Sequence, residues 1–242
     1  MHMVASTHEL LPTSRGQGGY LQFRNELMQV SKIIKAESLH IQAYHLIKES
    51  IMNGKLKPED RIVEARTAKE LGVSRGTVRE AVRMLIQDGL LLYNDGLVKV
   101  YNPSRKDIVD IFECRESLEV LAIRLALKNL DEDTLRRLAQ NIEETKKLDS
   151  SSSELGTYDQ EFHTIIIESS NNNHLIKLLE AIKVKLHYMR NCMVGEPFYT
   201  SFIEEHQRIY DALADRDAER AETLMSEHVQ KALKGVLMHI EA

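Results

Sequence analysis

The chain has 242 residues, enough for two modest domains, and 43% of them are hydrophobic, so it can bury sizeable cores. No uninterrupted apolar run approaches the roughly 20 residues that cross a bilayer, and the first residues lack the pattern of a secretory signal. Four Pro, eleven Gly and no Trp favour helices with aliphatic cores over an all-β fold. We therefore expect a mainly α protein of the cytoplasm, with no membrane partner.

The net charge of −5 is unevenly divided along the chain. Residues 1–103 carry 14 Lys and Arg against 11 Asp and Glu, whereas residues 104–242 carry 18 against 26. Nucleic acid binding is therefore compatible with the first part and disfavoured by the second. Cys114 and Cys192 lie far apart without the spacing of a metal or redox motif, which suits a reducing cytoplasm. We expect both to be small core residues.

Residues 1–37 are predicted to be an N-terminal extension that is partly disordered. Residues 1–19 show no hydrophobic period, but residues 20–35 carry apolar side chains at helical spacing. This pattern predicts an amphipathic helix and leaves open whether it packs on its own domain or binds a partner. The stripe consists of Phe23, Leu27, Val30 and Ile34.

Residues 38–103 are predicted to form three helices and a hairpin. Ser38 can cap the first helix, a short helix spans about 64–71, and Ser74 can cap a third that runs to Asp88. Two short apolar runs then flank an Asp-Gly pair, which is a strong hairpin signal. Three helices followed by a hairpin make a winged helix-turn-helix. The inward face of the third helix is predicted to consist of Val78, Val82, Leu85 and Ile86.

The third helix carries the residues expected to read DNA. Arg75 and Arg79 are four residues apart on the face opposite the apolar one, and arginine can contact guanine through two hydrogen bonds. Ser74 and Thr77 can contact phosphates or base edges near the helix N-terminus, and Gly96 would lie at the hairpin turn. An arginine stripe alone is more often a solvated face, but the whole arrangement favours binding to double-stranded DNA.

The stretch "IVEARTAKELGVSRGTVREAVRMLIQDGLLLYNDGLVKV" resembles the winged-helix domain of the GntR family of bacterial transcription regulators. The resemblance covers about residues 39–103. It implies that Arg75 and Arg79 contact operator bases, that Ser74 and Thr77 support them, and that Gly96 lies at the tip of the wing.

Three departures from the family pattern affect the preferred operator rather than the fold. Glu59 follows Pro58 where the family usually has Gly, and Gly76 stands where a residue with a side chain is more usual. Ala65 occupies a position where many relatives carry a DNA-contacting Arg. Arg66 comes one step later, which rotates its side chain by about 100° around the helix.

Residues 104–242 are predicted to form an antiparallel all-α bundle. Apolar residues recur at helical spacing in six segments, separated by Asp131, the serine run 150–153, the asparagines 171–173, the Gly-Glu-Pro at 195–197, and Asp215. The six segments are 105–129, 132–149, 154–170, 173–193, 198–214 and 216–240.

Four residues of this bundle are candidate metal ligands. Asp159 and His163 are four residues apart and project from one helical face, while His206 and His228 lie on or near the apolar stripes of the last two helices. One carboxylate and three imidazoles can together bind a divalent transition ion. Taken singly, each histidine is more often a hydrogen-bonded core residue, so the pattern alone leaves both interpretations open.

Residues 105–240, which contain "CRESLEVLAIRLA" from Cys114 on, resemble the FCD-type effector domain of the FadR subgroup of that family. "YDQEFH", "EEHQRIYDAL" and "SEHVQKAL" match the metal-binding motifs of its metal-containing members in order. The resemblance implies a zinc or nickel ion on the four ligands. It also implies a small carboxylate effector held by Arg115, with Arg190 as a second candidate. Either arginine can instead pair with a glutamate of the bundle.

Together the two resemblances imply a homodimer that binds a palindromic operator. An effector bound beside the metal would shift the population of conformations through the linker at 102–106 and release repression, with activation as the alternative sign. A purely structural metal, or a metal that is itself the signal, is an alternative.

A metal-dependent enzyme is disfavoured. The residues three before the histidines are Gln160, Ile203 and Met225 rather than the Glu of di-iron bundles, and no general base lies beside the ligands. We expect no catalysis.

Overall fold

The computed structural model describes residues 37–149, 152, 154–194 and 202–240. The helix expected at 20–35, the break expected at 195–197 and the first residues of the segment 198–214 lie outside these ranges. Residues 39–242 form one compact unit. No helix in the described ranges is long and apolar enough to cross a membrane.

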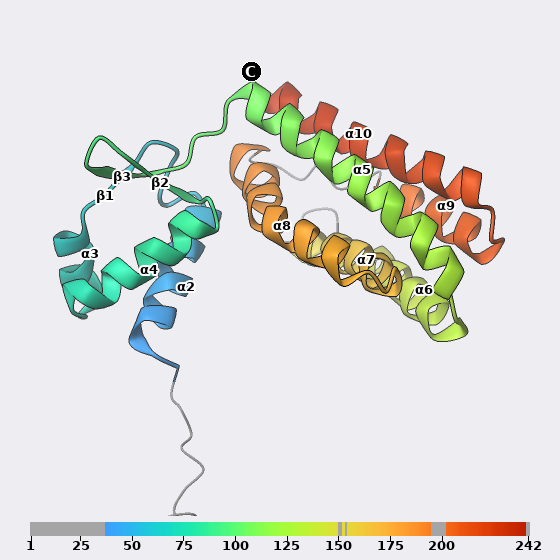
Figure 1. The fold of residues 1–242 in the computed structure, drawn as a ribbon, viewed down its shortest axis with the longest axis horizontal. Coiled ribbons are helices and arrows are strands. Elements are labelled where there is room, and N and C mark those ends of the chain that lie inside the picture. The colour runs from blue at the N-terminus through green and yellow to red at the C-terminus, as the bar shows by residue number, and fades with distance from the viewer. Residues whose placement is uncertain (1–36, 150–151, 153, 195–201, 241–242) are drawn as a thin grey trace, which may run out of the picture. The chain divides into compact units, whose positions relative to one another are not determined.

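The first part of this unit contains three helices and a small antiparallel sheet (Figure 1). In the sheet, β3 lies between β1 and β2, and Leu91 of β2 pairs with Val100 of β3. This arrangement confirms the predicted winged helix-turn-helix. The sequence did not indicate β1, because two residues are too short to show a period. The elements are α2 (Leu39–Met52), β1 (Arg61–Ile62), α3 (Glu64–Leu71), α4 (Arg75–Gln87), β2 (Leu91–Asn94) and β3 (Leu97–Val100).

The apolar face of α4 packs into the core of this part. Val78, Val82 and Leu85 are buried, as predicted, together with Ala81, and Ile86 is partly buried against the same core. Since these residues fix the rotation of α4, the arginines on its opposite face must point outward. The fold therefore presents the basic face of α4 to the exterior.

Two turns depend on residues with positive φ. Asp95 and Gly96 have φ of 50° and 75°, the combination that a two-residue hairpin turn needs, which explains the Asp-Gly pair in the wing. Glu59 has φ of 70° at the position where the sequence departs from a usual Gly. The left-handed region costs a residue with a side chain about 1 kcal/mol, and an ion pair of 2.9 Å between Glu59 Oε2 and Lys99 Nζ offsets part of it.

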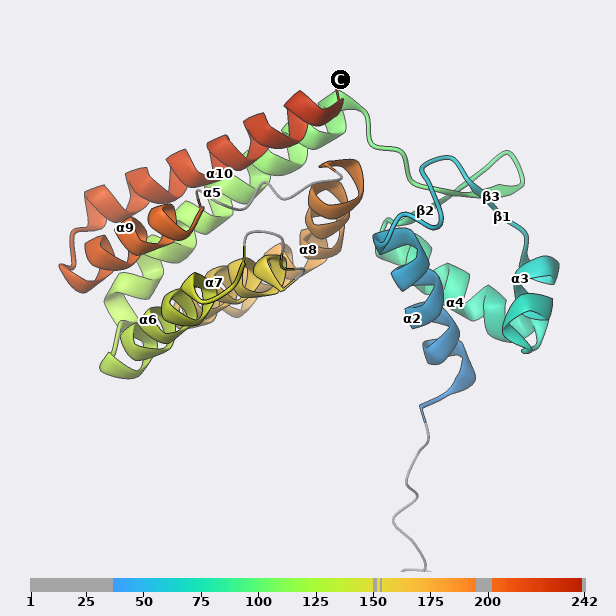
Figure 2. The same cartoon turned by 180° about the vertical axis from the view of Figure 1, so that it is seen from behind.

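The second part is an all-α bundle, as predicted. Figures 1 and 2 both show α5 and α10 side by side, and the two helices are in contact. Ser104 and Asp107 form a capping box at the start of α5, and Asp131 caps the next helix. The helices are α5 (Arg105–Asn129), α6 (Glu132–Lys146), α7 (Leu155–Ser169), α8 (Asn173–Val194), α9 (Phe202–Ala214) and α10 (Ala218–Ile240).

The prediction that Cys114 is a core residue is wrong, because its side chain is exposed. Its neighbours Phe112 and Arg115 on α5 are buried, and a helical step of about 100° per residue turns position 114 away from that buried face. The side chain of Cys192 lies outside the described residues.

Candidate metal centre and DNA-reading helix

The N-terminus of α4 is capped by Ser74. Its Oγ accepts a hydrogen bond of 3.1 Å from the backbone N–H of Thr77 and lies 2.8 Å from the Thr77 hydroxyl. Both hydroxyls thus belong to the cap, which stabilises the first turn of the helix by about 1 kcal/mol. Ser74 is exposed and Thr77 half-buried, so the structure places both at the start of the basic face.

The arginines of α4 differ in their partners. Arg75 is exposed and makes no ion pair with any residue that the structure describes. Arg79, which is 57% exposed, lies 3.1 Å from Glu64 Oε2 at the start of α3, and Arg83 pairs with Glu80 on its own helix. Because Glu64 restricts the Arg79 side chain, Arg75 is the more readily available cation at the exposed end of α4.

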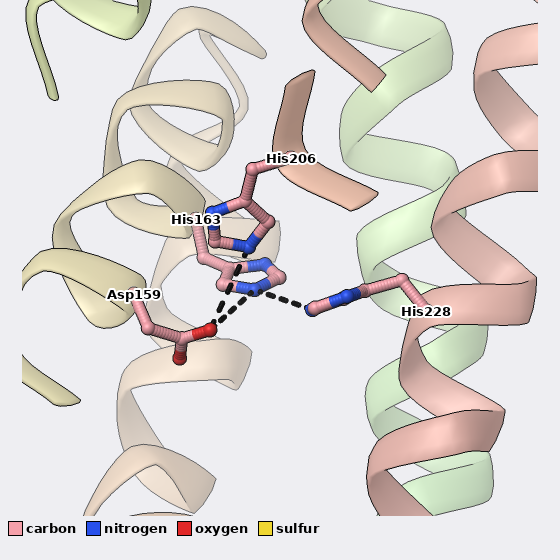
Figure 3. Close-up of side chains that lie close together, drawn as sticks. All are labelled: Asp159, His163, His206 and His228. Carbon is pink, nitrogen blue, oxygen red and sulfur yellow. Dashed lines mark hydrogen bonds and ion pairs between the residues drawn. The ribbon is translucent and has the colours of Figure 1, made fainter. Parts of the chain in front are cut away.

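The four candidate metal ligands come together inside the bundle. Asp159 and His163 lie one turn apart on α7, His206 comes from α9 and His228 from α10. Their side chains point toward one another (Figure 3), and one ligand atom from each lies within 4.8 Å of the others. None of the four residues is more than 5% exposed. The structure thus unites the four residues that sequence reasoning selected.

Two glutamates orient the histidine rings. Glu119 Oε2 on α5 lies 2.5 Å from Nδ1 of His163, and Glu205 Oε2 on α9 lies 2.7 Å from Nδ1 of His228. A ring whose Nδ1–H faces a carboxylate presents an unprotonated Nε2, which is the atom that binds metal. His206 is fixed differently, by stacking on Phe162 with ring centroids 3.8 Å apart.

The surroundings of Asp159, His206 and His228 favour the protonation states that metal binding requires. Burial holds the pKa of His206 well below its usual range, and burial likewise lowers the pKa of His228. For Asp159, burial opposes ionisation, but the Arg190 guanidinium and the nearby histidines overcome it and hold the pKa of the carboxyl below its usual range. Neutral imidazoles and an ionised carboxylate are the forms that coordinate a cation.

The distances between ligand atoms fit a small cation. Nε2 of His163 lies 3.1 Å from Nε2 of His228, and Asp159 Oδ1 lies 3.5 Å from Nε2 of His206 and 3.9 Å from Nε2 of His163. Ligands of tetrahedral zinc, with bonds of about 2.1 Å, lie about 3.4 Å apart. Two acceptor nitrogens at 3.1 Å repel each other without a cation, and Nε2 of His206 is buried without a hydrogen-bond partner. The residues therefore fit a bound divalent ion.

The two predicted effector-binding arginines lie beside this cluster. Arg115 on α5 is buried; its Nε donates to Glu119 Oε1 at 2.6 Å and its Nη2 lies 3.3 Å from Nε2 of His163. Its Nη1 is buried without a hydrogen-bond partner. Arg190 on α8 pairs with Asp159 Oδ2. Arg115 therefore forms the pair with a glutamate that was considered as an alternative, whereas Arg190 pairs with an aspartate of the metal cluster.

A cavity of about 110 Å³ opens between α7 and α8 next to the metal cluster. Arg115, Glu119, His163 and Arg190 line the end at the cluster, and the remainder is lined by aliphatic side chains together with polar ones. Sequence reasoning selected Arg115 and Arg190 but missed Glu119 and Glu205. Glu119 follows Arg115 by one helical turn, and this spacing is a signal that could have identified it; Glu205 has no comparable signal.

Replacing Glu119 by Gln is expected to weaken metal binding by about 10- to 100-fold, the usual effect of losing a carboxylate that orients a metal-binding histidine. The amide keeps the shape of the side chain but makes His163 a weaker base and leaves Arg115 without its counter-ion. Competition with a coloured zinc chelator measures the change. Glu113→Gln, at an exposed position of the same helix, is the control. Zinc affinity of Glu119→Gln within twofold of the wild type would refute the orienting role.

Comparisons with known proteins find matches to both parts of the chain. The family model described as "Bacterial regulatory proteins, gntR family" matches residues 39–97, and the model described as "FCD domain" matches residues 110–231. The HTH-type transcriptional regulator YdhC of Bacillus subtilis is 33% identical over 202 residues, which cover 81% of this chain and 90% of that protein. The HTH-type transcriptional repressor GlaR of Escherichia coli is 24% identical over 215 residues, which cover 81% of this chain and 97% of that protein.

Solved structures show the same fold. The Escherichia coli protein McbR/YncC superposes with a TM-score of 0.68 at 23% identity, covering 84% of this chain and 99% of that one. The relatives described above are transcription regulators rather than enzymes.

Proposed function

Since the chain belongs to the GntR family of bacterial transcription regulators and carries an FCD domain, we propose that it is a metal-containing repressor released from DNA by a small carboxylic acid. Residues 38–103 form the DNA-binding domain and residues 104–242 the effector domain. A homodimer presents two α4 helices to a palindromic operator. Arg75 and Arg79 contact base edges in the major groove, Ser74 and Thr77 contact the adjacent backbone, and the wing at Gly96 lies against the DNA.

One observation carries the effector site: four buried metal ligands converge next to a cavity whose lining includes Arg115, and one guanidinium nitrogen of this arginine has no hydrogen-bond partner. Asp159, His163, His206 and His228 would bind zinc or nickel. A bound ion supplies positive charge and open coordination positions for a carboxylate oxygen. The guanidinium of Arg115 would pair with the same carboxylate, while Arg190 keeps Asp159 ionised and correctly placed.

Helix α8 links this site to the DNA-binding domain. Leu186 and Arg190 line the cavity, and Tyr188 on the same turn is buried in the core of the DNA-binding domain. Its hydroxyl donates a hydrogen bond of 2.7 Å to the backbone oxygen of Tyr101, immediately before the linker at 102–106. A ligand that displaces α8 would therefore move the start of the linker and change the relative populations of DNA-binding conformations.

A thermal-shift screen of acetate, lactate, succinate, citrate and hexanoate on the zinc-loaded protein tests this function. A ligand at about 100 times its Kd adds about 2.7 kcal/mol of stability, which raises Tm by about 5–11 °C for a chain of this size. The shift must disappear when zinc is first removed with a chelator. If chelation lowers Tm but no acid shifts the zinc-loaded protein, the metal is structural and the effector-release proposal fails.

A further inference from the structure

The cavity beside the metal cluster is polar at one end and aliphatic at the other. It extends along one face of α7 from Gly156 and Gln160, past His163, to Ile167, and along α8 from Arg190 back to Ile176. The cationic side chains gather at the metal end. The other end is walled by Ile167, Ile176 and Leu179, of which Leu179 is buried and the two isoleucines are partly buried.

The aliphatic end carries negative rather than positive charge at its rim. Glu168 and Glu180 are exposed and line the cavity next to Ile167 and Leu179 in the sequence, and Arg137 Nη2 lies 3.4 Å from Glu168 Oε2. Lys183, the remaining cation of the lining, is exposed on α8. It lies about one turn nearer the metal cluster than Leu179 does. A second carboxylate at the far end would therefore meet the like charges of Glu180 and Glu168, although Arg137 offsets part of the charge of Glu168.

From this arrangement we propose that the effector is a monocarboxylic acid with an unbranched aliphatic tail. The proposal rests on the proposed function: the carboxylate lies at the metal and Arg115, and the tail lies against Ile167, Ile176 and Leu179. Ile167 is one turn beyond His163, about 6 Å along the helix axis. With carbon–carbon bonds of about 1.5 Å, a tail of about five carbons covers that distance. The favoured ligand therefore resembles hexanoate more than acetate or a dicarboxylate.

We call Ile167, Ile176 and Leu179 the tail site, and Arg115 with the metal ligands the carboxylate site. Calorimetric titration of the zinc-loaded protein with acetate, butyrate, hexanoate and adipate tests the tail site. Each buried methylene is expected to tighten binding about fourfold, so Kd should fall steadily from acetate to hexanoate. Adipate has the length of hexanoate but a second carboxylate beside Glu168 and Glu180, and it should bind at least about tenfold more weakly, since unpaired charge is costly to bury.

Two variants on α8 separate the tail site from the carboxylate site. Ile176→Ala should weaken hexanoate binding about tenfold by removing buried carbons and leave acetate binding unchanged. Leu178→Ala is the control, because Leu178 is 56% exposed and does not line the cavity; it should change neither.

The possible outcomes distinguish this inference from the proposed function. If acetate and hexanoate bind equally, or adipate binds as tightly as hexanoate, the tail site is refuted while the carboxylate site stands. The tail site is equally refuted if Ile176→Ala weakens acetate and hexanoate alike. If none of the four acids binds the zinc-loaded protein but lactate, succinate or citrate raises its Tm, this inference is wrong while the effector part of the proposed function stands.

Discussion

Replacing Arg75 by Ala will weaken operator binding by about 5- to 150-fold for each half-site that the arginine contacts. A two-hydrogen-bond contact to guanine contributes about 1–3 kcal/mol of discrimination, and Arg75 makes no competing ion pair among the described residues. The operator is first selected from random duplexes by the wild-type protein. Titration of this operator by fluorescence anisotropy at fixed salt then gives the Kd of the wild type and the Kd of the variant. The variant should also tolerate changes at the contacted base pair better than the wild type.

Arg136→Ala provides the matched control for this prediction. Arg136 lies on α6, is 73% exposed and pairs with Asp133 three residues before it. Its loss removes the same charge from the chain but no group near the DNA-reading helix. An equal loss of operator affinity in both variants would show that only net charge matters. An operator Kd of Arg75→Ala within twofold of the wild-type value would show that Arg75 does not contact a base.

The second large effect is expected from His206→Ala. This change removes one of four ligands, so bound zinc should fall from about one ion per chain to far less, measured by elemental analysis after dialysis. A metal present at about 1,000 times its Kd adds about 4 kcal/mol of stability, and its loss should lower Tm by about 8–16 °C. Chelator treatment of the wild type should produce most of the same decrease.

His174→Ala separates this effect from the general cost of removing a histidine. His174 is exposed at the start of α8 and lies outside the metal cluster, so its variant should keep both the zinc and the Tm of the wild type. The metal account fails if His206→Ala retains a full complement of zinc, or if a chelator leaves the wild-type Tm unchanged while the variant melts early.

Periodicity predicted the helices well because each one buries a continuous stripe. The predicted segment 105–129 coincides with α5, and the predicted inward face of α4 is buried. Shorter features were missed. The two residues of β1 carry no period, and the position of Cys114 on the outer side of α5 follows from helix rotation, which here prevails over the tendency of cysteine to be buried.

The metal cluster was only partly predictable. The four-residue spacing of Asp159 and His163 follows from the sequence, but His163 and His228 are 65 residues apart, and only the order of the family motifs indicated that they meet. The carboxylates of Glu119 and Glu205 depend on the packing of α5 against α7 and of α9 against α10. Periodicity does not determine which charged residues face each other across helices, so the pairing of Arg190 with Asp159 and the contact of Glu119 with His163 had to come from the structure.

The most direct test of the account is the affinity of the zinc-loaded protein for its selected operator, measured with and without an acid that stabilises it. The account predicts that the saturating acid raises the operator Kd by at least about tenfold, in the range of ordinary allosteric coupling, and that the same acid has no effect after zinc is removed. An operator Kd that stays constant in the presence of the bound acid, or that rises equally in the zinc-free protein, would contradict it.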